Sequence, residues 1–176
     1  MHSLACAAGL DDPLSPSKPE AQARGIRLPP LRMVPPMRVV FDTSVLVAAA
    51  RSRRGASFEL VEAIPMGAFQ LCLSVALYAE WHDALLRPEH AIPGTSPEMT
   101  LGFLRYIASQ AHLQEIYFLW RPFLPDADDD MILERAVAAQ CRIIVTHNVR
   151  DFAGADQFGI ECMPPGDFLR LLRGIS

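Results

Sequence analysis

The sequence contains a single lysine, Lys18, which precedes every predicted helix and strand. A P-loop nucleotide site needs a lysine at the phosphates, so the sequence excludes that class. Receiver domains and hydrolases of the haloacid dehalogenase type also need a lysine beside their phosphate. The latter require a second aspartate two residues after the first, and Ser44 stands at that distance from Asp42. The missing lysine argues against both aspartyl-phosphate classes.

Cysteine is scarce, and none of the four cysteines has zinc-site spacing to another cysteine or a histidine. Three of them lie in apolar runs and are predicted to be buried free thiols: Cys72, Cys141 and Cys162. This usage is typical of a reducing cytosol and predicts a cytoplasmic protein. No apolar run approaches the roughly 20 residues that span a bilayer, so we expect no membrane segment.

The chain of 176 residues suits one domain, and its 51% hydrophobic content is enough for a sizeable core. Residues 1–36 differ from the rest because they hold seven prolines and little periodicity. Proline fixes φ and removes a backbone donor, so no regular element is expected there. We interpret residues 1–36 as a disordered tail, or as a mis-assigned start with Met37 as the true beginning. The folded domain is predicted to cover residues 37–176.

From residue 37 onward, strand-like and helix-like segments alternate. Short β-branched or apolar runs predict strands at 38–41, 70–73, 142–146 and 160–163. Periodicity and capping residues predict helices after residue 43 and at 58–64, 75–86, 97–112, 128–140, 149–152 and 166–172. This order predicts an α/β fold, a three-layer α/β/α domain around a mainly parallel sheet.

Acidic side chains accompany the ends of these strands. The first strand ends at Asp42, and the second leads into a helix that carries Glu80. Four more aspartates open the helix before the 142–146 strand, and further polar residues follow that strand: Asp126, Asp128, Asp129, Asp130, Thr146, His147, Asn148 and Asp151. Ligands of such sheets bind beyond the carboxyl ends of the strands, so these acids are expected to gather there.

Gathered carboxylates repel one another, and a hard divalent cation would offset that cost. Mg²⁺ and Mn²⁺ prefer oxygen ligands and support in-line displacement at phosphorus. Each acid alone has an ordinary explanation, for example as a helix cap or a solvated side chain. The joint arrangement therefore predicts a metal site more strongly than any one member does.

Several segments also resemble the motifs of PIN-domain proteins, in the correct order. They are MRVVFDTSVLV at residues 37–47, SVALYAE at 74–80, DDDMILERA at 128–136, RIIVTHNVRDF at 142–152 and MPPGDFL at 163–169. The resemblance implies a Mg²⁺- or Mn²⁺-dependent endoribonuclease, often the VapC-like toxin of a type II toxin–antitoxin pair. A cognate antitoxin and a homodimer are the partners it implies.

By the same resemblance, the metal-site acids are Asp42, Glu80 and Asp130. Asp130 is chosen because it lies sixteen residues before Thr146, where the family places its acid. The family often has aspartate at the place of Asn148, so Asp151 is expected to supply the missing catalytic charge. Three further hydroxyl and amide side chains are expected to support these acids: Thr43 or Ser44, Thr146 and Asn148.

A basic cluster after the first predicted helix, Arg51, Arg53 and Arg54, is a candidate for RNA phosphate contacts. His147 is a weaker candidate for touching RNA. The alternative to an enzyme is a catalytically impaired module that acts through protein or RNA binding. For such a module, the apolar helices at 58–64 and 97–107 would form a dimer or antitoxin surface.

Overall fold

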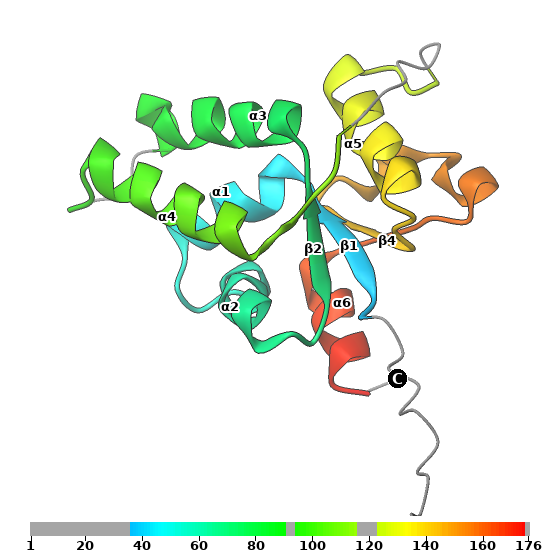
Figure 1. The fold of residues 1–176 in the computed structure, drawn as a ribbon, viewed down its shortest axis with the longest axis horizontal. Coiled ribbons are helices and arrows are strands. Elements are labelled where there is room, and N and C mark those ends of the chain that lie inside the picture. The colour runs from blue at the N-terminus through cyan, green and yellow to red at the C-terminus, as the bar shows by residue number, and fades with distance from the viewer. Residues whose placement is uncertain (1–35, 91–93, 116–122, 175–176) are drawn as a thin grey trace, which may run out of the picture. The chain divides into compact units, whose positions relative to one another are not determined.

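The computed structural model describes residues 36–90, 94–115 and 123–174, and it builds them around a parallel sheet (Figure 1). The strands are β1 (Arg38–Phe41), β2 (Gln70–Leu73), β3 (His112–Leu113), β4 (Ile143–Val145) and β5 (Glu161–Met163). Their order across the sheet is β3-β2-β1-β4-β5, and each neighbouring pair is parallel. The predicted tail falls outside these residues, apart from Pro36, and therefore stays a prediction.

Helices cover the sheet on both faces and complete the predicted three-layer α/β/α architecture. The α-helices are α1 (Thr43–Arg51), α2 (Ala56–Ala63), α3 (Val75–Leu86), α4 (Pro97–Gln110), α5 (Ala127–Ala138) and α6 (Pro165–Leu172). Short 3₁₀ helices are η1 (Ile64–Met66), η2 (Pro88–His90), η3 (Val149–Phe152) and η4 (Ala155–Phe158). Helix α5 packs on β1, β2 and β4, whereas α1 packs against α2 and α3 (Figure 1).

The core explains why these segments adopt these positions. In β1, Val39, Val40 and Phe41 are fully buried, as expected for a central parallel strand with helices on both faces. Trp81 on α3 is also fully buried and belongs to the same hydrophobic core. Helix α3 begins where the sequence predicts, because the Ser74 hydroxyl accepts the backbone N–H of Leu77 at 3.2 Å.

The edge strand β3 is a strand that sequence reasoning missed. The predicted helix 97–112 ends at Gln110, and His112 pairs with Cys72 of β2 instead. Two residues carry no strand periodicity, so this strand exists only through its partner. The fully buried Arg135 holds it from α5, because its guanidinium donates to the carbonyls of Leu73, His112 and Gln114.

Within the described ranges, no helix combines the length and apolar character needed to cross a bilayer.

Candidate metal centre

The carboxyl ends of β1 and β4 bring two sequence-distant residues side by side. Phe41 pairs with Val145 in the sheet, so Asp42 and Thr146 each follow a paired residue. The backbone N–H of Asp42 also donates to the carbonyl of Val145 at 2.9 Å. The sheet register therefore sets the position of Asp42 before any side-chain contact forms.

Two hydroxyl groups orient the carboxylate of Asp42. Its Oδ2 accepts a hydrogen bond from Ser44 Oγ at 2.5 Å and another from Thr146 Oγ1 at 2.6 Å. Asp42 is buried and Thr146 is fully buried, so the bond between them is shielded from solvent. With Oδ2 engaged twice, Oδ1 is the oxygen left for a ligand. Hydroxyl groups that hold a carboxylate in this way are typical supports of metal-binding acids.

Glu80 lies in the second turn of α3 and reaches the same edge. Its Oε1 accepts a hydrogen bond from Thr43 Oγ1 at 2.5 Å, which ties it to the first turn of α1. Its Oε2 is buried and has no hydrogen-bond partner. Burial, together with the negative charges of Asp128, Asp42 and Asp129, raises the pKa of Glu80. An orphaned, buried carboxylate oxygen in a field of like charge is well suited to a cation.

Helix α5 supplies the remaining acids from its first turns. Asp126 caps the helix, because its side chain accepts the backbone N–H of Asp128 at 2.8 Å. Burial and the charges of Asp42, Asp126, Asp151 and Asp128 raise the pKa of Asp129 to about 6. Asp129 therefore lies in the field of acids from β1 and from the segment after β4. We call Asp42, Glu80, Asp129 and Asp151 the acid cluster.

Asp130, the α5 acid favoured from its spacing to Thr146, has different partners. Its carboxylate accepts the backbone N–H of Phe123 at 2.9 Å and that of Leu124 at 2.8 Å. Successive residues of an α-helix point about 100° apart, so Asp129 and Asp130 leave the helix in different directions. In this structure, Asp130 holds the segment before the helix, and Asp129 is the acid whose charge interacts with Asp42.

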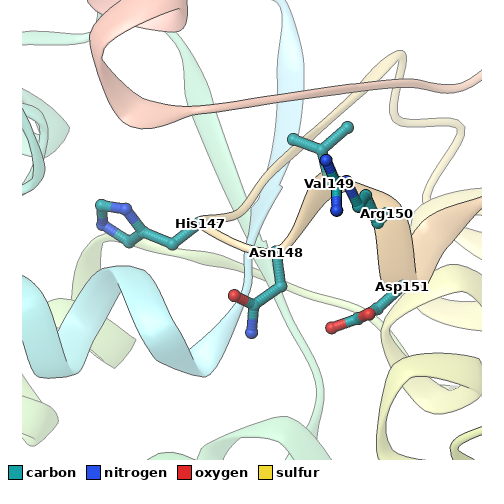
Figure 2. A pocket seen from close by; sticks show the side chains of 5 residues that line it. All are labelled: His147, Asn148, Val149, Arg150 and Asp151. Atoms are coloured by element: carbon teal, nitrogen blue, oxygen red, sulfur yellow. The ribbon is translucent and has the colours of Figure 1, made fainter.

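The segment after β4 forms the outer wall of the site. His147 to Asp151 line a hollow of about 320 Å³ (Figure 2). Figure 2 shows the side chains of Asn148 and Asp151 on the same side of this segment, whereas His147 points away from them. Asn148 is held through its backbone, which donates to Thr146 Oγ1 at 2.9 Å. Its carboxamide is exposed together with the carboxylate of Asp151.

His147 has a structural role that sequence reasoning missed. Its Nε2 lies 3.0 Å from the buried Ser57 Oγ on α2, and its backbone N–H donates to Ser44 Oγ. His147 therefore connects two groups: the Ser44 hydroxyl, which orients Asp42, and the first turn of α2. No sequence signal identified Ser57, which lies 90 residues before His147. The basic cluster Arg51, Arg53 and Arg54 is exposed just before α2.

The acid cluster has the donor chemistry of a divalent-cation site but is not a closed cage. Among the residues that the structure describes, no three Asp, Glu, His or Cys side chains are close enough to form a ready metal cage. The chemistry nevertheless fits a hard cation. The acids offer only oxygen, Glu80 keeps one buried oxygen without a partner, and like charges raise the pKa of both Glu80 and Asp129.

Comparison with known proteins identifies the family of the chain. The model of the PIN domain family matches residues 38–150, so the chain belongs to the PIN-domain family. Among solved structures, the chain is similar to the crystal structure of VapBC2 from Rickettsia felis bound to a DNA fragment from their promoter, with a TM-score of 0.50 and 15% identity. That match covers 72% of this chain and 98% of the other. At this identity, the likeness shows the fold alone. No curated protein matches the sequence.

Proposed function

We propose that this protein is a divalent-metal-dependent endoribonuclease that hydrolyses RNA phosphodiester bonds. The observation that carries the proposal is the acid cluster at the carboxyl end of the sheet, with the orphaned Oε2 of Glu80 inside it. Nuclease activity is the general property of PIN domains, which agrees with this chemistry. The predicted acids Asp42, Glu80 and Asp151 are retained in the proposal, and Asp129 replaces Asp130 among the metal ligands.

In this proposal, Asp42, Glu80 and Asp129 hold Mg²⁺ or Mn²⁺. The bound ion would activate water and stabilise negative charge on the phosphate. Ser44 and Thr146 keep Oδ2 of Asp42 occupied, so that Oδ1 is presented in one orientation. Thr43 does the same for Glu80 through Oε1. Asp151, an exposed acid of η3 whose charge acts on Asp129, would accept the proton of an attacking water.

RNA contacts in this proposal come from arginine. Arg51, Arg53 and Arg54 are exposed beside the first turn of α2, and none has an ion-pair partner among the described residues. Guanidinium groups bind phosphate oxygens in pairs of hydrogen bonds. The mildly acidic chain would thus bind RNA locally and not over its whole surface.

The proposal extends to biological context. The solved relative is a VapBC complex, which supports a toxin–antitoxin role and an antitoxin partner for this chain. A homodimer and a cytoplasmic location belong to the same proposal. The catalytically impaired binding module remains the competing function, because Asn148 stands where an acidic ligand is expected.

The test is cleavage of single-stranded RNA by the purified protein with Mg²⁺ or Mn²⁺, compared with EDTA. Asp42→Asn should lower the rate by at least roughly 100-fold, because it weakens a ligand and its two hydroxyl contacts. Asp83→Asn is the matched control, since Asp83 is an exposed acid on α3 that pairs with His82. Wild-type protein that binds neither ion and cleaves no RNA would favour the binding module.

A further inference from the structure

The backbone just after β4 is held by the hydroxyl groups that orient Asp42. The N–H of Thr146 still donates to a carbonyl of β5, whereas the next two N–H groups donate to side chains. That of His147 donates to Ser44 Oγ at 3.2 Å, and that of Asn148 donates to Thr146 Oγ1 at 2.9 Å. The position of this short segment is therefore tied to both hydroxyls.

These backbone bonds decide which way each hydroxyl donates. A hydroxyl group has one hydrogen to donate and lone pairs that accept. Because Ser44 Oγ accepts the N–H of His147, its own hydrogen is directed to Oδ2 of Asp42, 2.5 Å away. Displacing the backbone of residue 147 would let the Ser44 hydroxyl rotate, and the carboxylate of Asp42 would lose a fixed donor.

The ring of His147 is held in turn by Ser57, in the first turn of α2. The two side chains lie within hydrogen-bond distance, with Ser57 Oγ 3.0 Å from Nε2 of the ring. Ser57 is 4% exposed, and a buried hydroxyl is costly unless it has such a partner. The hydroxyl does not cap its own helix, because Gly55 occupies the N-cap position and α2 has no side-chain cap.

Helix α2 is fastened to the domain by other contacts. Leu60 and Val61 are buried in the hydrophobic core. Glu59 forms an ion pair with Arg173, which follows α6, at 2.6 Å. The contact of Ser57 with the ring is therefore not needed to keep α2 in place. What it restrains is His147, which is then held both at its ring and at its backbone N–H.

We propose that Ser57 is a positioning residue that sets the affinity of Asp42 for the divalent cation. It acts through two intermediates, the ring and backbone of His147 and the hydroxyl of Ser44. Groups that orient a metal ligand without touching the metal are known to tune its affinity. The inference rests on the metal centre of the proposed function, but it does not depend on RNA.

The test is a calorimetric titration with Mn²⁺ in the absence of RNA. Ser57→Ala should weaken Mn²⁺ binding by about 3- to 10-fold, less than the roughly 10- to 100-fold expected for Ser44→Ala, because Ser57 lies further from Asp42 along the chain of contacts. Glu59→Gln is the matched control, since it removes a different contact of the same helix and should leave the affinity unchanged. A merely structural role of Ser57 would lower the melting temperature without changing the affinity.

A double variant tests whether the effect passes through Ser44. Once Ser44→Ala has broken the chain of contacts, adding Ser57→Ala should weaken Mn²⁺ binding no further. Losses that multiply in the double variant would overturn the inference, because Ser57 would then act on the site by another route.

The remaining outcomes separate this inference from the proposed function. Wild-type affinity for Mn²⁺ in Ser57→Ala would overturn the inference and leave the proposed function standing. Weaker RNA binding by Ser57→Ala in EDTA, with unchanged Mn²⁺ affinity, would also overturn it, because the pair with His147 would then serve RNA. A wild type that binds no Mn²⁺ would overturn both. The expected Mn²⁺ affinities without any RNA cleavage would contradict the proposed function alone.

Discussion

Replacing Asp129 with asparagine should stabilise the metal-free protein at neutral pH and abolish its stabilisation by Mg²⁺. Asp129 is the α5 acid that interacts with Asp42 and Asp151, and its pKa is raised to about 6 from an ordinary value of 3.8. The folded state therefore favours the neutral form of this side chain. Asparagine resembles that neutral form in shape and carries no charge, so it removes the repulsion.

The size of the stabilisation expected from Asp129→Asn follows from the pKa of Asp129. A rise in the Asp129 pKa from 3.8 to about 6 would lower the free energy of unfolding by roughly 3 kcal/mol at neutral pH if solvent did not screen the charges. Asp129 is only partly buried, so solvent screening lowers the expected effect to about 1 kcal/mol. For a domain of this size, about 1 kcal/mol shifts the melting temperature by roughly 3 °C.

The pH dependence has a definite sign. Because the pKa is higher in the folded state, that state binds more protons between about pH 4 and pH 6. Asp129 therefore lowers stability progressively as pH rises through this window, and the loss is complete above it. The difference in melting temperature between Asp129→Asn and wild type should be near zero at the acidic end and largest above about pH 6.

The assay is thermal unfolding in EDTA and in Mg²⁺ across this pH range, with Asp130→Asn as the neighbouring control. Mg²⁺ should stabilise wild type but not Asp129→Asn. Asp130→Asn should lose about 1–3 kcal/mol in both buffers, because the backbone donors of Phe123 and Leu124 lose a carboxylate acceptor. If Asp130→Asn instead abolishes the Mg²⁺ effect and Asp129→Asn keeps it, Asp130 is the ligand and the assignment of Asp129 is refuted.

Two further predictions concern the supports of the site and of the sheet. Thr146→Val preserves shape but removes the hydroxyl that donates to Asp42, so affinity for Mn²⁺ measured by calorimetry should fall about 10- to 100-fold; an unchanged affinity would mean that Thr146 does not orient Asp42. Arg135→Met leaves the carbonyls of Leu73 and His112 without their donor and should lower the free energy of unfolding by roughly 3 kcal/mol. In urea titrations, the exposed Arg105→Met should change stability by no more than about 0.5 kcal/mol, and an equal loss in both variants would contradict the role given to Arg135.

Most of the layer architecture was predictable because it depends on local pattern. The β1 run of Val39, Val40 and Phe41 reads as a buried strand, and Ser74 reads as a helix cap. Strand β3 was not predictable, since two residues become a strand only when β2 lies beside them. The buried Arg135 was equally hidden, because its partners are backbone carbonyls that no sequence motif identifies.

The sequence by itself determined which chemistry the protein offers: oxygen donors at the ends of parallel strands, arginine as the cation of the folded domain, and no lysine for a phosphoenzyme or a P-loop. Only the tertiary structure separated Asp130 from its neighbours Asp128 and Asp129. These residues are neighbours in sequence and equivalent in composition, but α5 turns each in a different direction. The structure directs Asp130 to the backbone of Phe123 and Leu124, and the charge of Asp129 toward Asp42 and Asp151. The physical reason is that the direction of a helical side chain is set by the packing of its helix on the sheet, which residue spacing alone does not record.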